Sequence, residues 1–91
     1  MKFYERIFNR RTENIGNITN FPEEQALANL LLISFYNSSS PGELPDEFSI
    51  FDIMLSKDSL KKLLEELGLN ISSIDLLVGS YGNSFKVSLK I

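Results

Sequence analysis

The side chains that most often carry out chemistry near neutral pH are absent from this chain. It has no histidine and no cysteine, which excludes the usual general base, the thiolate nucleophile and nearly all zinc sites. Its five glycines are scattered, and none has the spacing of a phosphate-binding loop. Any catalysis would therefore depend on carboxylates or lysines.

Two groups of carboxylates are close enough in the sequence to act together. Glu65 and Glu66 are neighbours on a predicted helix, where their side chains diverge by about 100°, whereas the carboxyl groups of a glycosidase must converge on one bond. Asp46, Glu47 and Asp52 could gather a magnesium ion, but an acidic loop followed by a strand is the simpler interpretation. We therefore predict no catalytic residue, no metal site and no cofactor, and we do not expect an enzyme.

The acidic residues are concentrated in the middle of the chain. The net charge is −3, yet residues 12–56 include seven acidic residues and no lysine or arginine. Carboxylates without basic neighbours repel each other, so a basic surface on another protein would relieve them. The predicted partner-binding residues are Glu23, Glu24, Glu43, Asp46, Glu47 and Asp52. The alternative is that these charges only keep the protein soluble.

The first eleven residues are basic and aromatic. The alternative site is an anion-binding patch made of Lys2, Arg6, Arg10 and Arg11. Such a patch could bind nucleic acid or an anionic membrane, although an acidic protein is a poor general binder of nucleic acid. A terminal helix that packs its rings on the core would explain the same pattern. We predict no membrane span, because the longest apolar run, 26–36, is about half the length required.

A helix over residues 57–67 has the clearest start and stop signals. Four leucines fall on one side of it: Leu60, Leu63, Leu64 and Leu67. Ser56 can cap its first amides and Gly68 can end it in the left-handed conformation. Two further helices are predicted, over 22–36 and 3–11, although a strand also fits residues 3–11. The apolar residues of 22–36 surround the helix axis, so we expect it to be covered on more than one side.

Three strands are predicted, at 48–55, 74–79 and 85–91. In the first, Phe51 and Ile53 would lie on one face and Phe48 and Ile50 on the other, although a short helix is an alternative there. The last two should form a hairpin. If Gly82 and Asn83 make a two-residue turn, the pairs on the buried face are Ile74 with Ile91, Leu76 with Leu89 and Val78 with Val87. The same register places Asp75 opposite Lys90.

The predicted fold class is α+β, a single domain of residues 1–91. A three-stranded sheet carries helices on one face, and residues 1–20 either dock on this domain or form a loosely attached extension. The loop 37–45, rich in serine and proline, separates the helices from the first strand.

These observations favour a small, cytoplasmic, non-catalytic module that binds the basic surface of another protein. An inhibitor, an immunity protein or an anti-defence protein of a phage or mobile element acts in this way. The alternatives are a homo-oligomer that pairs through sheet edges or the N-terminal rings, and the anion binder described above.

Overall fold

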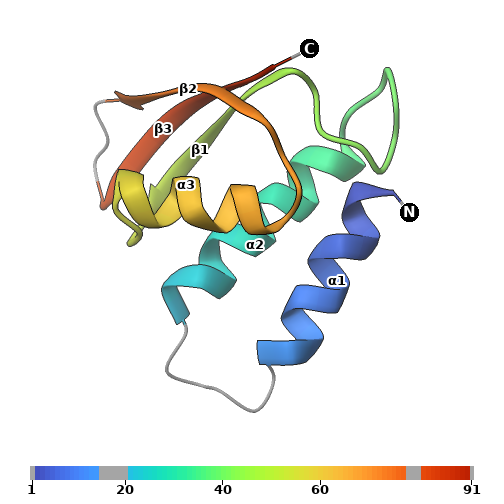
Figure 1. Cartoon of the computed structure of the whole chain (residues 1–91), viewed down its shortest axis with the longest axis horizontal. Coiled ribbons are helices and arrows are strands. Elements are labelled where there is room, and N and C mark those ends of the chain that lie inside the picture. Colours follow the sequence, from blue (N-terminus) through green and yellow to red (C-terminus); the bar gives the residue numbers. More distant parts are fainter. Residues whose placement is uncertain (1, 15–20, 78–80, 91) are drawn as a thin grey trace.

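The computed structural model describes residues 2–14, 21–77 and 81–90 (Figure 1). These residues form three helices and three strands in the order α1 (Phe3–Asn14), α2 (Phe21–Phe35), β1 (Glu47–Ile53), α3 (Lys57–Glu66), β2 (Ile71–Leu77) and β3 (Asn83–Leu89). The α+β fold class is confirmed, and the predicted elements differ from the observed ones only at their ends.

The sheet has β3 in its centre, with β1 and β2 on either side of it, and both neighbours run antiparallel to β3. The helices lie on one side of the sheet (Figure 1). Helix α2 contacts β1, α3 contacts β2, and α1 packs against α2. The core lies between the sheet and the helices. Its fully buried members include Ile7, Leu27, Leu30, Ile50, Ile53, Leu60, Leu64, Phe85 and Val87.

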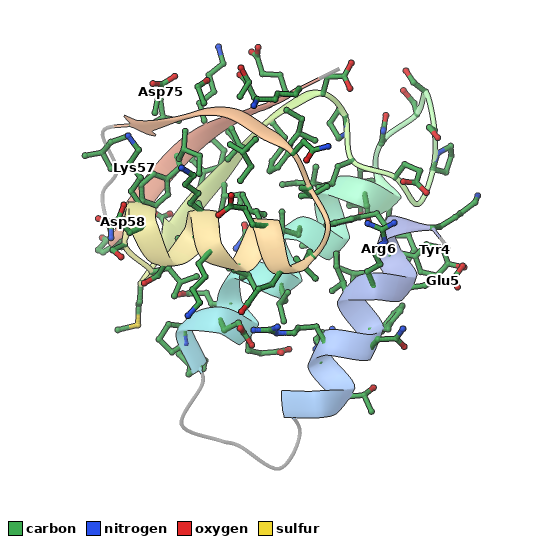
Figure 2. The ribbon with its side chains drawn as sticks, viewed as in Figure 1. Tyr4, Glu5, Arg6, Lys57, Asp58 and Asp75 are labelled. Atoms are coloured by element: carbon green, nitrogen blue, oxygen red, sulfur yellow. The ribbon has the colours of Figure 1, made fainter. Side chains whose placement is uncertain are left out.

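Residues 3–14 are a helix and not a strand, and this helix contributes to the core. Phe3 and Ile7 are buried. Arg6 donates a hydrogen bond from Nη1 to the carbonyl oxygen of Leu67, at 3.0 Å, and so satisfies one of the carbonyls left free at the end of α3. Figure 2 shows Arg6 reaching from α1 toward this turn.

Helix α3 begins and ends as predicted. The Ser56 hydroxyl accepts a hydrogen bond from the amide of Ser59, at 3.3 Å. At the other end Gly68 has a φ of 87°, and the amide of Leu69 donates to the carbonyl of Leu64, at 3.1 Å. This is the hydrogen-bond pattern of a Schellman motif.

Replacement of Ser56 with alanine should lower the free energy of unfolding by about 1 kcal/mol, because α3 loses its N-cap. Urea denaturation followed by circular dichroism measures this change. Ser38→Ala is the control, since Ser38 is exposed in a loop and its removal should have almost no effect. An equal change for the two variants would contradict the capping role.

The predicted alternation of β1 is wrong after Ile50. Phe48, Ile50 and Ile53 are all buried, whereas Phe51 and Asp52 are exposed. The register with β3 shifts between Ile50 and Ile53, and Asp52 has a φ of 56°. A β-bulge inserts one extra residue and so reverses which side chains face the core. The short-helix alternative for this segment is also excluded.

The hairpin of β2 and β3 is present, but its predicted register is wrong. Ile74 pairs with Val87 and Asp75 pairs with Lys86, four positions from the predicted partners. A shift by an even number of residues keeps the same side chains on the helix-facing side of the sheet, but the prediction that Leu76 is buried there is wrong, because it is 67% exposed. Leu77 pairs with Ser84, so the connection is longer than two residues. The predicted pairs that involve positions 78 and 91 lie outside the described residues.

Gly82 and Asn83 do not form the predicted tight turn. They contact the end of β1 instead. Asn83 donates a side-chain hydrogen bond to the carbonyl of Leu55, at 2.9 Å, and it pairs with Ile53. Gly82 has a φ of 103°, and a Cβ atom there would lie 2.8 Å from the carbonyl oxygen of Ile53. The glycine is therefore required both by its backbone conformation and by the close approach of β1.

Candidate functional site

The structure divides the predicted acidic residues into two groups. Glu23, Glu24 and Glu43 have partners on α1. The other three, Asp46, Glu47 and Asp52, belong to β1 or precede it. The acidic segment of the sequence is therefore not one continuous surface.

Two members of the first group, Glu23 and Glu24, are neutralised by arginines of α1. Arg10 Nη2 lies 2.5 Å from Glu23 Oε1 and 2.9 Å from Glu66 Oε2, so one guanidinium joins α1, α2 and α3. Its hydrogen bond to Glu23, opposed in part by burial, raises the pKa of Arg10 above its ordinary value. Arg11 Nε lies 2.6 Å from Glu24 Oε1 in a more exposed pair.

Glu43 caps the beginning of α1. Its Oε1 accepts a hydrogen bond from the amide of Phe3, at 3.2 Å, where the helix dipole favours a negative charge. The next amide, that of Tyr4, donates to the carbonyl of Gly42, at 3.1 Å. Lys2 Nζ donates to the carbonyl of Pro41, at 3.4 Å. The loop predicted at 37–45 is therefore bound to the first turn of α1.

The alternative anion-binding residues are engaged in the same contacts. Lys2 and Arg6 bind main-chain carbonyls, and Arg10 and Arg11 bind carboxylates. The sequence does contain one signal for this arrangement, since an Arg-Arg pair ends one helix and a Glu-Glu pair begins the next. Two helices joined by a short connection place such pairs opposite each other.

A hollow of about 210 Å³ adjoins the Arg10 ion pairs. It is lined by Arg10, Glu23, Leu55, Ser59, Lys62, Leu63 and Glu66. Its arginine, Arg10, already binds both of its carboxylates, Glu23 and Glu66, so all three are engaged within the fold. Among the described residues no three carboxylates lie close enough together to hold a metal ion.

Of the second group of carboxylates, Glu47 faces the side of the sheet that the helices leave open, because it alternates with the buried Phe48. Asp46 and Asp52 are exposed at the two ends of β1, and Asp75 extends from β2 on the side away from α3 (Figure 2). Glu47 pairs with Lys86, with Oε1 and Nζ 2.8 Å apart. The hydrogen bond to Glu47 raises the pKa of Lys86. The sequence predicts that Asp75 faces outward, from its position between Ile74 and Leu76 in an alternating strand, but Asp75 is not among the predicted partner-binding residues.

Between these charges the open face has both polar and apolar side chains, the latter including the exposed Phe51. Short serine side chains occupy the outward positions of all three strands: Ser49 on β1, Ser73 on β2 and Ser88 on β3. The two outward lysines, Lys86 and Lys90, equal in number the outward carboxylates, and the exposed Asp46 and Asp52 add negative charge at the ends of β1. The face therefore has an acidic character that the neutralised helical side lacks.

None of the helices among the described residues is long and apolar enough to cross a membrane. Comparison with known proteins finds no relative: no family model, no curated protein sequence and no solved structure matches this chain.

Proposed function

We propose that this protein is a non-catalytic protein-binding module that presents the open face of its sheet to a basic surface of another protein. A small cytoplasmic inhibitor, immunity protein or anti-defence protein would act in this way, by occupying a cationic groove. The observation that carries the proposal is the division of the carboxylates. Those on the helical side stabilise the fold, whereas Asp46, Asp52 and Asp75 form no salt bridge within the described part of the chain.

The geometry of the face suits such a contact. The sheet leaves one side uncovered, and its outward side chains include three serines and the exposed ring of Phe51. A rigid face with an excess of negative charge attracts a positive surface over a distance of about one Debye length. The binding free energy would then come from the close fit, and the selectivity from the charge.

The test neutralises the three carboxylates for which the described part of the chain shows no salt bridge. We expect the triple variant Asp46→Asn, Asp52→Asn and Asp75→Asn to recover the partner at least about tenfold less well than the natural chain, because the attraction is lost. The experiment is affinity capture from a lysate of the native host, with quantification by mass spectrometry. Glu43 is left unchanged because its substitution would disturb α1.

The matched control is Glu5→Gln, Asp58→Asn and Glu65→Gln, which changes the net charge equally but alters α1 and α3. This variant should retain the partner. Raising the salt from about 50 mM to about 500 mM should reproduce the effect of the sheet variant, since exposed charges are screened at high salt. A partner captured equally by both variants would contradict the proposal.

A further inference from the structure

The outward side of α2 has large apolar side chains that are exposed and do not belong to the core. Phe21 is 60% exposed, Leu32 56% and Phe35 49%, and Tyr36, which follows the helix, is 83% exposed. Helix α2 is covered on two sides, by β1 and α1, and its buried apolar residues are Ala26, Leu27 and Leu30. The prediction of coverage on more than one side is thus confirmed, but a third, apolar side is left open.

The residues on this side have a regular spacing. Phe21, Gln25, Ala28, Leu32 and Phe35 follow one another at alternating intervals of four and three residues; we call them the α2 strip. This spacing allows two helices to pack side by side at about 20°. With 15 residues, α2 is about 22 Å long, which provides three turns or more for such a contact.

The charge around the α2 strip favours a second copy of this chain as the occupant. Residues 25–42 contain no charged side chain, and Arg11 and Glu24, near the beginning of α2, bind each other. A highly charged partner would gain nothing from this surface. Two copies that each carry a net charge of −3 repel each other least where their charges are absent.

The area is also sufficient for a dimer. The exposed parts of Phe8, Phe21, Leu32, Phe35 and Tyr36 amount to about 500 Å² of apolar surface, on the basis of roughly 200 Å² for a whole aromatic side chain. Two copies would bury about 1,000 Å², which is the lower limit of specific interfaces before any polar rim is added.

We propose that α2 pairs with α2 of a second copy in an antiparallel, two-fold symmetric dimer with Ala28 at the axis. Phe21 and Phe35 are each seven residues from Ala28, so Phe21 of one copy lies opposite Phe35 of the other. Leu32 then lies near Gln25 of the second copy. The short side chain of Ala28 lets the two helices approach closely at the crossing. The open faces of both sheets stay accessible, because the helices lie on the other side.

A single thiol tests the position of the axis. The chain has no cysteine, so Ala28→Cys introduces one, and a symmetric dimer brings two copies of it together. Under mild oxidation we expect a disulfide-linked dimer to form at least about tenfold faster than with Leu76→Cys, because the dimer raises the local thiol concentration. Leu76 is an exposed leucine on β2. Equal rates for the two variants would overturn the proposal.

Two leucine substitutions test the surface itself. Leu32→Glu should weaken dimerisation at least about tenfold, because it places a carboxylate in the apolar contact near Gln25 of the second copy, without a basic partner, whereas Leu76→Glu should not change it. Sedimentation equilibrium of the full chain gives the masses. A monomer up to about 1 mM would overturn the proposal, since specific association is stronger than this. Binding of a monomer to phosphatidylcholine vesicles would also overturn it and assign the α2 strip to a membrane surface.

Discussion

Replacement of Arg10 with methionine should lower the free energy of unfolding by about 2–3 kcal/mol, because it takes the cation away from a carboxylate that is almost entirely buried. The side chain of Glu23 is only 10% exposed and that of Arg10 is 27% exposed, so solvent screens this pair less than an ordinary surface pair. The same guanidinium holds Glu66 of α3. Its loss therefore removes a link among three helices. Chemical denaturation at several pH values measures the change.

The neighbouring pair supplies the control for Arg10. Arg11→Met breaks the contact with Glu24, in which both side chains are more than a third exposed, and it should cost less than about 1 kcal/mol. The raised pKa of Arg10 means that its contribution is complete at every pH below the ordinary pKa of an arginine and is lost only at higher pH. The difference between the natural chain and Arg10→Met should therefore be constant from about pH 6 to pH 10. Equal losses for Arg10→Met and Arg11→Met would contradict this account.

Replacement of Gly82 with alanine should be about as damaging, with a loss of about 2–3 kcal/mol. A residue with a side chain pays roughly 1–2 kcal/mol for a left-handed backbone, and the new Cβ would also meet the main-chain oxygen of Ile53 at 2.8 Å. Because a main-chain atom cannot rotate away, β1 or the hairpin must shift. Thermal unfolding and urea denaturation both measure this loss.

Gly68→Ala is the matched control, since its φ of 87° is similar but the nearest atom is the end of the flexible Arg6 side chain. We expect a loss of about 1–2 kcal/mol there, mostly from the backbone conformation. Combination of Gly68→Ala with Arg6→Ala should give less than the sum of the two losses, because the collision disappears. A loss at Gly82 no larger than at Gly68 would show that β1 does not approach as closely as described.

The two proposals, partner binding and dimerisation, use different surfaces of the same molecule. Partner binding by the sheet face is inferred from its charge, and dimerisation through the α2 strip is inferred from the absence of charge there. The two proposals are therefore independent, and an experiment that contradicts one does not contradict the other. If both hold, a dimer would present two acidic sheet faces to its partners. Such an arrangement increases apparent affinity wherever both faces can bind at once.

The sequence by itself determined the local elements of this protein. The helix after Ser56 depends on a cap, a leucine stripe and Gly68, all within a few residues of one another, and such short-range interactions can be read directly from the order of residues. The same holds for the alternating strand that ends with Leu89. The fold class follows from these elements, because their apolar faces can be buried together in few ways.

Only the tertiary structure decided the details on which the functional site depends. The bulge at Asp52 and the longer connection before Gly82 are set by contacts with Ser84 and Ile53 on distant strands. The acidic segment looked unrelieved because its counter-charges lie far away in the sequence: Arg10 is 13 residues from Glu23 and 56 from Glu66. Pairing across such distances depends on how helices pack, so periodicity and composition do not reveal it. The two surfaces proposed for partners, the sheet-side carboxylates and the uncharged side of α2, were thus recognised only once the helices and strands were packed.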